Sequence, residues 1–341
     1  MTTSSITPPV TSLSPLAADL GLAFCRSKLL LSALELGVFS ALADRPLTIS
    51  ELCARLGLHG RGARDFLEAL VALGLLNRVG NGFANTAATT GLIRGPGYAA
   101  GFLDGANYVL YPAWGGLTTA LRTGTPPGDV DIEATLHDPI RQRMYLAMMD
   151  ALSAPLAPAL AEAIDWDRHR VVADIGGARG NMIALLLTAH PHLRGVVFDR
   201  PQNRESCVEH IAHAKLDGRV EFVGGDFFAD PLPAADVIVI GHVLADFSED
   251  QRRGLVRAAF RALPPGGALL VYDPMPADDD PSLDSLVASL HMLLMTPEGA
   301  GYRPSRCVAW MTEAGFARTE TRPLPLGNGL VVGHVAGHKE G

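Results

Sequence analysis

The second half of the chain alternates short apolar runs with longer amphipathic ones. From about residue 170 the strand-like runs are VVADI, GVVFD, VEFVGGD, DVIVIGHV and ALLVYD, and runs such as NMIALLLTAH and QRRGLVRAAFRAL between them have helical spacing. Strands that alternate with helices form a parallel sheet covered by helices, because each crossover between parallel strands carries a helix. The sequence therefore predicts a doubly wound α/β domain over residues 169–341.

A different pattern occupies residues 15–110. It predicts an apolar helix over about 16–42, a short helix capped by Ser50, and a further helix in HGRGARDFLEALVALGLL. LNRVGNGFANT then predicts a hairpin with its turn at Gly80-Asn81-Gly82. Three helices and a two-stranded wing are typical of a winged helix. Residues 111–168 have a helical pattern and are expected to connect the two units and line a pocket, and residues 1–14 are expected to form a flexible tail.

A winged helix suggests DNA binding, but the charges argue against it. The formal net charge is -8, and the candidate recognition helix offers Arg61 and Arg64 against Asp65 and Glu68. Helices that read a DNA groove need positive charge toward phosphate and polar side chains toward base edges. This helix is nearly neutral and largely apolar, which favours contact with a second copy of the chain. The sequence predicts no nucleic-acid partner.

Cysteines and hydropathy bear on the compartment. The four cysteines lie far apart with no CxxC pair, which favours reduced thiols over a disulfide or zinc framework. No uninterrupted apolar run reaches the roughly 18 residues of a membrane span. The N-terminal residues lack the basic and apolar segments of a secretory signal. We therefore expect a cytoplasmic protein.

The turn after the first predicted strand has the geometry of a ligand site. VVADIGGARG places Asp174 and Gly176 at the carboxyl end of that strand, where doubly wound sheets bind ligands. The dinucleotide fingerprint GxGxxG is absent, since Ala178 and Asn181 stand where glycines are needed, and a Walker lysine is absent too. The turn allows close backbone approach to a helix N-terminus, which suits a ligand carboxylate.

Two further strand ends extend this interpretation. The second strand ends in Asp199, about twenty residues past the glycine turn, where an acidic side chain accepts hydrogen bonds from ribose hydroxyls. The third leads to Asp226 and Phe227, which offer an acceptor and an aromatic face for an adenine. Each feature alone is typical of turn chemistry or a strand-end cap. Together they predict a nucleoside ligand that lacks phosphates.

The segments VVADIGGARG, GVVFDRP, GRVEFVGGDFF, GHVLADFSED and LPPGGALLVYDPM, after a winged-helix front end, resemble the caffeate/acetylserotonin-type O-methyltransferase family and its bacterial relatives. The resemblance covers nearly the whole chain. It implies a Rossmann-like class I methyltransferase sheet, an N-terminal all-helical winged-helix dimerisation domain, a domain-interleaved homodimer, and S-adenosylmethionine as methyl donor. The residues that it assigns to the cofactor are Asp174, Gly176, Asp199, Asp226, Phe227 and Met148.

The acceptor is expected between the C-terminal sheet and the helices that hold Trp114 and Met292. The stretches NYVLYPAW, with Tyr108, and HMLLM, with Met295, suggest a flat, apolar acceptor. At helical spacing such residues are more often core or dimer contacts. The pocket interpretation therefore rests on the resemblance.

The sequence departs from the family at its usual base. The histidine of an LHDW-like segment is replaced by Ala245 in LADF, and the glutamate that orients this histidine falls at Gly301. A positioned base contributes ~10²–10⁴-fold, whereas holding two substrates in line contributes ~7–11 kcal/mol. Loss of the base therefore does not abolish methyl transfer. An acceptor that arrives ionised needs only positioning.

Three side chains are candidates for a substitute base. Asp246 stands at the family's aspartate position, with a strand-end cap as the alternative interpretation. His242 lies three residues before Ala245, and strand alternation can turn its ring toward the helices instead. His291 is interpreted first as a pocket-lining residue, second as a base, and third as a metal ligand with His242 or Asp246 for an α-keto acid. No metal site is assigned.

Three functions follow from these patterns. The first is O-methylation of an acidic hydroxyl on an aromatic or heteroaromatic secondary metabolite. The second is C-methylation, with or without a metal, or non-methylating chemistry on a methyltransferase fold. The third is a winged-helix regulator that senses a small ligand, and the nearly neutral recognition helix argues against it.

Overall fold

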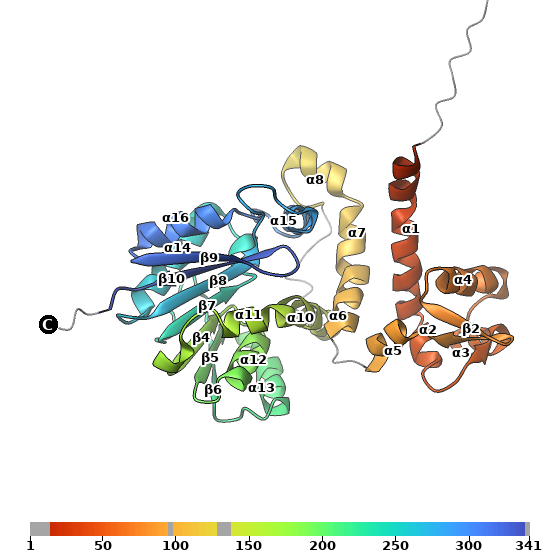
Figure 1. Cartoon of the computed structure of the whole chain (residues 1–341), viewed down its shortest axis with the longest axis horizontal. Helices are drawn as coiled ribbons and strands as arrows, with labels where there is room; N and C mark the ends of the chain where they lie inside the picture. The colour runs from red at the N-terminus through yellow and green to blue at the C-terminus, as the bar shows by residue number, and fades with distance from the viewer. Residues whose placement is uncertain (1–13, 95–97, 128–137, 338–341) are drawn as a thin grey trace, which may run out of the picture. The chain divides into compact units, whose positions relative to one another are not determined.

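The computed structural model describes residues 14–94, 98–127 and 138–337 (Figure 1). The chain divides into two compact units, residues 1–107 and 108–341. The helical segment predicted over 111–168 lies in the second unit. Of the tail predicted over 1–14, all but Ser14 lies outside the described residues.

The first unit packs helices around a small antiparallel sheet. Its strands have the order β1-β3-β2, and the predicted hairpin is present as β2 and β3. Leu52, Leu67 and Phe83 are fully buried at its centre. The elements are α1 (Pro15–Glu35), α2 (Val38–Ala41), β1 (Leu47–Thr48), α3 (Ile49–Leu56), α4 (Gly60–Ala72), β2 (Leu76–Val79), β3 (Gly82–Asn85), α5 (Ala87–Arg94) and α6 (Tyr98–Gly105).

Two local predictions in this unit are wrong. The single helix predicted over 16–42 breaks after Glu35, because Gly37 adopts a left-handed conformation with φ of 73° before α2 begins. The N-cap of α3 is Thr48 rather than Ser50. Glu51 decides the position, since its carboxylate accepts the Thr48 backbone N–H at 2.7 Å while the Thr48 hydroxyl accepts the Glu51 N–H at 3.3 Å.

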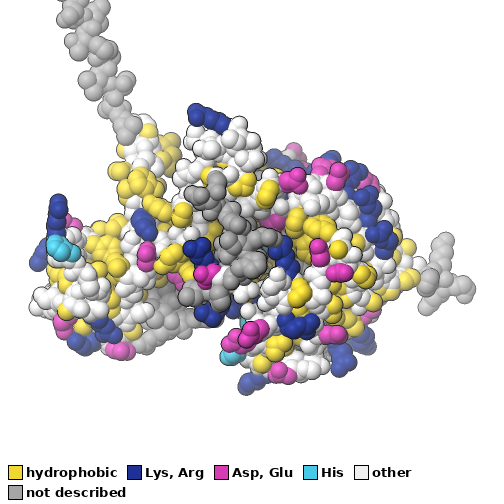
Figure 2. All heavy atoms as spheres, turned by 180° about the vertical axis from the view of Figure 1, so that it is seen from behind, with side chains coloured by type: hydrophobic (Ala, Val, Ile, Leu, Met, Phe, Trp, Pro, Cys, Tyr) yellow, Lys and Arg dark blue, Asp and Glu magenta, His cyan; other side chains and the backbone are white. Residues whose placement is uncertain are grey.

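One face of α1 is apolar and exposed. Leu16, Leu20 and Phe24 follow one another at a spacing of four residues and are 70%, 64% and 59% exposed. Figure 2 shows hydrophobic side chains gathered over this helix. A stripe at this spacing lies along one side of a helix and is typical of a surface that packs against another apolar surface.

The second unit is built on a seven-stranded sheet with the order β6-β5-β4-β7-β8-β10-β9. The first five of these strands are parallel, as predicted, whereas β10 is antiparallel to both β8 and β9. The predicted doubly wound α/β class is confirmed, and the two antiparallel strands add to it. The strands are β4 (Val171–Ile175), β5 (Arg194–Asp199), β6 (Val220–Gly224), β7 (Val237–Gly241), β8 (Ala268–Pro274), β9 (Arg318–Pro323) and β10 (Asn328–His334).

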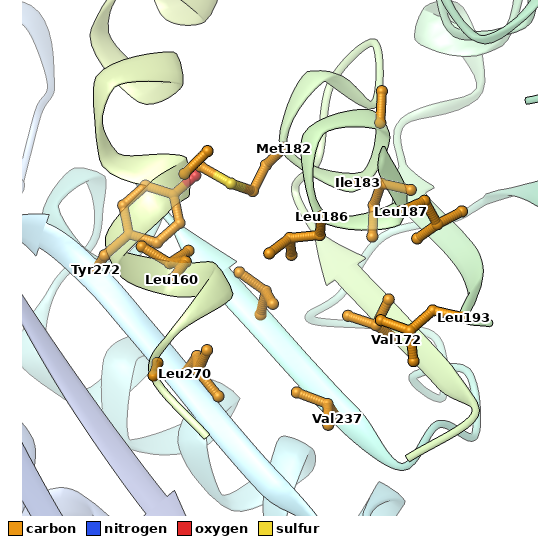
Figure 3. Close-up of a cluster of buried hydrophobic side chains, with 14 of the residues drawn as sticks. Leu160, Val172, Met182, Ile183, Leu186, Leu187, Leu193, Val237, Leu270 and Tyr272 are labelled. Carbon is orange, nitrogen blue, oxygen red and sulfur yellow. The ribbon is translucent and has the colours of Figure 1, made fainter. Parts of the chain in front are cut away.

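Helices cover both faces of this sheet. Figure 1 shows α11 (Ala157–Ala161), α12 (Asn181–Ala189) and α13 (Arg204–His213) on one face, and α14 (Glu249–Ala262) and α16 (Pro304–Ala314) on the other. Each face has its own apolar cluster. In the first cluster, drawn in Figure 3, Leu186 lies with the sheet residues Val237 and Leu270, and all three are fully buried. Burial of such side chains stabilises the layers by about 1.5–3 kcal/mol each.

Further helices precede or follow the sheet. Within this unit α7, α8 and α15 share a third, smaller cluster with Leu294 at its centre. The remaining elements are the π-turn η1 (Ala106–Leu110), α7 (Tyr111–Trp114), α8 (Leu117–Thr123), α10 (Pro139–Ser153), α15 (Leu283–Met295), and the 3-10 turns η2 (Ala154–Leu156), η3 (Trp166–Arg168), η4 (Pro201–Asn203) and η5 (Leu244–Asp246).

Residues 141–161 form the one helical stretch of the described chain that is long and apolar enough to cross a membrane by length and composition. Its second half packs in the core, where Leu156 and Leu160 are fully buried. Core helices of soluble proteins pass the same test, so this result is weak evidence for a membrane span. The expected absence of a membrane partner stays a prediction.

Candidate active site

A cavity of about 430 Å³ opens at the carboxyl ends of β4, β5, β7 and β8. The strand order reverses between β4 and β7, and this is the place where doubly wound sheets bind ligands. The residues that line the cavity come from α10, the β4–α12 turn, the segment after β5, the segment after β7 and the end of α15. The cavity lies wholly within the second unit.

The β4–α12 turn leaves no room for larger side chains. A Cβ added to Gly176, whose φ is 77°, would lie 2.5 Å from Val243 Cγ2, and one added to Gly177 would lie 2.8 Å from the Asp174 carboxylate. Asp174 is 3% exposed. Its burial, together with the nearby charge of Asp199, raises its pKa to about 7. The turn therefore brings backbone and a partly protonated carboxyl group to the cavity wall.

Asp199 is held by hydrogen bonds on both carboxylate oxygens. Oδ2 accepts the Ala178 backbone N–H at 2.7 Å, and Oδ1 accepts the Arg200 backbone N–H at 2.6 Å and the Asn203 Nδ2 at 2.8 Å. Burial raises the pKa of Asp199, and these donors oppose that shift. Asn203 in turn accepts from Gln142 Nε2 at 3.0 Å, which links the carboxylate to α10. The carboxylate is fixed at the cavity wall with lone pairs left for ligand hydroxyls.

The structure places the residues after β6 differently from one another. Phe227 lines the cavity and meets Phe247 edge to face, with ring centroids 5.6 Å apart. Asp226 is exposed and is not among the lining residues, and its carboxylate accepts the Phe228 N–H at 2.8 Å. The side chain of Asp226 thus caps its own turn, as the alternative interpretation of such strand-end residues has it.

On α10 the neighbours of Met148 face the cavity. Met148 is buried and is not among the lining residues, whereas Tyr145, Met149 and Asp150 are. Adjacent residues on a helix point about 100° apart, so a shift of one position changes the facing side. In the nearly continuous apolar run around Met148, the sequence does not show which side that is.

An ion pair that sequence reasoning missed borders the same end of the cavity. Arg179, in the β4–α12 turn, donates its Nε to Asp150 Oδ2 at 2.7 Å and pairs with it through Nη2 as well. Asp150 is 5% exposed, and burial raises its pKa against the opposing effect of Arg179. The available signal was an aspartate inside the apolar run YLAMMDALS, because a buried charge requires a partner.

Asp246 lies on η5 and lines the cavity. Its burial raises its pKa to about 7. Ala245, at the family's histidine position, does not line the cavity, and its carbonyl oxygen accepts the Ala300 N–H at 2.9 Å. A Cβ added to Gly301 would lie 2.7 Å from Ser289 Oγ, so this position has no space for a glutamate.

His242 also lines the cavity, directly after β7. Its Nε2 lies 2.8 Å from Asn328 Oδ1, and its ring packs edge to face on Tyr272 with centroids 5.1 Å apart. Burial lowers its pKa, and the hydrogen bond to Asn328 opposes that shift. The ring therefore lies against the sheet residues Tyr272 and Asn328 at the wall of the cavity.

The remaining sequence candidates fall outside or at the edge of this site. Met295 lines the cavity, whereas Met292 packs against the core of the α14–α16 face. Trp114 and His291 meet edge to face with centroids 5.3 Å apart, and neither lines the cavity. Tyr108 is 54% exposed.

A metal site has no support in the side chains that the structure describes. Within residues 14–94, 98–127 and 138–337, no group of three or more His, Cys, Asp or Glu side chains could hold a metal ion. Hard and borderline cations need at least that many protein ligands in the sites known to bind bidentate keto acids and related substrates.

Known proteins match the chain along most of its length. The model of the O-methyltransferase domain matches residues 114–317, and that of the O-methyltransferase dimerisation domain matches residues 18–94. The chain belongs to the O-methyltransferase family. The predicted family, fold class, enzyme class and, at the level of the family, the cofactor S-adenosylmethionine are confirmed. The exposed face of α1 falls in the matched dimerisation domain, in agreement with the predicted homodimer.

Individual relatives of this methyltransferase act on different groups. The chain is 45% identical to the tetracenomycin polyketide synthesis 8-O-methyl transferase TcmO of Streptomyces glaucescens, over 92% of this chain and 95% of that protein. It is 38% identical to the N,N-dimethyltransferase OxyT of Streptomyces rimosus, over 97% and 99%. A solved O-methyltransferase family protein from Burkholderia thailandensis is 28% identical with a TM-score of 0.85, over 97% and 100%.

Proposed function

We propose that this methyltransferase transfers the methyl group of S-adenosylmethionine to an acidic hydroxyl on an aromatic polyketide. The observation that supports the cofactor site is the Asp199 carboxylate, fixed by three donors beside a glycine turn that admits no side chain. The acceptor class is suggested by the likeness to TcmO, which is named for O-methylation in polyketide synthesis.

The residues fit a nucleoside with an amino-acid tail. Asp199 has oxygens for the ribose hydroxyls, and Phe227 has an aromatic face for the adenine. The β4–α12 turn leads into the N-terminus of α12, which suits a ligand carboxylate. When bound, the cofactor supplies an electrophilic methyl group on a sulfonium. The protein holds the acceptor in line with that group and excludes water, which accounts for much of the rate.

The test is a calorimetric titration of the full-length dimer with S-adenosylmethionine and S-adenosylhomocysteine. We expect micromolar binding, and a loss of at least about tenfold in affinity in Asp199→Ala, because a hydrogen bond to a charged group is worth about 1.5–3 kcal/mol. Asp284→Ala is the matched control, since Asp284 is exposed in the first turn of α15. Unchanged binding by Asp199→Ala would place the cofactor elsewhere and overturn the proposal.

A second acceptor class follows from the likeness to OxyT, named as an N,N-dimethyltransferase and 38% identical to the chain. An arylamine needs no base once its nitrogen is neutral, so the loss of the family's histidine would be tolerated by this reaction too. Parallel assays with 1-naphthol and 1-naphthylamine separate the two classes. Methylation of the amine alone would replace the hydroxyl in the proposed function.

A further inference from the structure

His242 and Asn328 form a buried pair on neighbouring parts of the sheet. His242 follows β7, and Asn328, which is 7% exposed, begins β10. The two residues are 86 positions apart in sequence. Tyr272 of β8 lies between the two strands and packs on the imidazole. The position of the ring is therefore set by contacts to two different strands.

The hydrogen bonds of Asn328 determine which imidazole nitrogen carries the proton. Its Nδ2 donates to the carbonyl oxygens of Pro325 at 3.1 Å and Leu326 at 3.2 Å. An amide nitrogen that has two carbonyl acceptors leaves its oxygen for the third neighbour, so Oδ1 faces His242. An oxygen acceptor at 2.8 Å requires a proton on Nε2. In the neutral ring Nδ1 then carries the lone pair.

That lone pair is open to the cavity. In the part of the chain that the structure describes, Nδ1 has no hydrogen-bond partner, and it is not one of the fully buried polar atoms that lack a partner. His242 lines the cavity, so Nδ1 is accessible there. A neutral imidazole with one nitrogen fixed by an acceptor and the other open toward a ligand has the arrangement of a general base.

The backbone supports a role beyond packing. His242 has a φ of 52°, in the left-handed region that is unfavourable for a residue with a Cβ. Such a conformation costs of order 1–3 kcal/mol and persists where the surrounding structure imposes it, often at ligand sites. The strain turns the chain directly after β7, where the cavity begins.

We propose that His242 is the general base for the acceptor hydroxyl and that Asn328 is the residue that positions it. This inference rests on the proposed function. The hydroxyl oxygen forms a bond to the methyl carbon, the carbon–sulfur bond breaks with its electron pair left on sulfur, and the hydroxyl proton passes to Nδ1. The imidazolium releases that proton to water after the products leave. The histidine thus supplies, from another position, the base that the family carries where Ala245 stands.

The other titratable groups around this cavity have different properties. Tyr272 of β8 has a pKa well above its usual value because it is buried, so it stays neutral. Asp174 of β4 and Asp246 of η5 have pKa values of about 7, and burial raises the pKa of Asp150 of α10. Asp246 is the competing base in the same cavity, and His291 is the competing histidine outside its lining.

The first test reads the imidazole itself, without an acceptor. Nitrogen NMR of 15N-histidine-labelled protein bound to S-adenosylhomocysteine, with the His242 signal assigned by its loss in His242→Gln, reports tautomer and titration. We expect a neutral ring protonated at Nε2 that titrates below the usual value of about 6.5. Asn328→Asp should raise the midpoint by about one unit or more, because a carboxylate stabilises the imidazolium. A proton on Nδ1, or a midpoint that Asn328→Asp leaves in place, would overturn the assignment.

The second test is the pH profile of kcat/KM with two naphthols. With 1-naphthol, His242→Gln should lose the acidic limb and about 10²–10⁴-fold in rate. With 2,4-dinitro-1-naphthol, which is already ionised at neutral pH, it should lose less than about tenfold. Asn328→Asp should move the limb to higher pH, which a purely structural role of the pair would not do. His334→Gln is the matched control, a half-buried histidine on β10 that does not line the cavity.

The competing bases give opposite outcomes. A limb that persists in His242→Gln and disappears in Asp246→Asn or His291→Gln would overturn the proposal in favour of that residue. If the protein binds S-adenosylmethionine but methylates neither naphthol, the proposed acceptor class fails, and the tautomer and titration of His242 still decide the inference.

Discussion

Asp199 and Asp246 lie in one cavity and have different environments. Asp199 accepts three hydrogen bonds, two of them from backbone N–H groups. Asp246 has a pKa of about 7 because it is buried, with only the more distant charge of Arg252 lowering it. The first carboxylate is arranged to remain an anion that receives hydroxyl protons. The second is arranged to exchange a proton near neutral pH.

The two ends of the cavity differ in the same sense. At the cofactor end, fixed backbone donors and a glycine turn fit one ligand geometry, which suits a group common to all members of a family. At the end with His242, Asp246 and Met295, side chains from separate elements set the chemistry. Function changes more readily there, because replacing one side chain does not disturb a backbone turn.

The largest effect that would sharpen this comparison comes from the turn. Gly176→Ala should destabilise the protein by about 2–4 kcal/mol and abolish cofactor binding, since the new Cβ combines an unfavourable φ with a 2.5 Å approach to Val243. Urea unfolding and calorimetry measure both quantities. Gly254→Ala is the control, because Gly254 lies in α14 with open space around its Cβ position. Binding that survives Gly176→Ala would show that the cofactor end tolerates change as the other end does.

The same contrast explains what could be predicted from sequence. The glycine turn and Asp199 were predictable because each is a local feature at a strand end, and strand ends meet at one edge of a parallel sheet. The contacts that tune the site join distant segments, such as Arg179 to Asp150 and Asn203 to Gln142. Nothing in the local pattern relates these partners.

His242 shows the limit most clearly. Its partner begins β10, an antiparallel strand that inserts beside β8 and that the helix–strand alternation did not predict. Helix phase was a second limit, because around Met148 apolar residues occur on every side of the helix and the facing side is set by packing. Cap position was a third, since Thr48 and Ser50 are both good caps and the contact to Glu51 decides.

A smaller effect should appear at the other carboxylate. Asp246→Asn should stabilise the protein by about 1–2 kcal/mol at pH 8 and leave it unchanged near pH 4, because each unit of pKa shift corresponds to about 1.4 kcal/mol. The folded pKa of Asp246 is raised, so the native state binds a proton that the unfolded state has lost. Stability from this group is present at low pH and is lost as pH rises from about 4 to about 7.

Urea unfolding of the unliganded protein at several pH values measures this difference. Asp284→Asn is the control, since its exposed carboxylate should give no such dependence. A stability gain of Asp246→Asn that is equal at pH 4 and pH 8 would mean that the carboxylate is ionised throughout. The contrast with Asp199 would then disappear.

The smallest effect tests how far the fixed geometry of Asp199 depends on side chains. Asn203→Ala removes one of three donors and leaves the two backbone N–H groups in place. We expect S-adenosylhomocysteine affinity to fall by about 0.5–1.5 kcal/mol, the usual net value of one hydrogen bond. Gln142→Ala should have a still smaller effect, because Gln142 reaches Asp199 only through Asn203. A loss in Asn203→Ala as large as that in Asp199→Ala would show that a side chain, rather than the backbone turn, fixes the carboxylate.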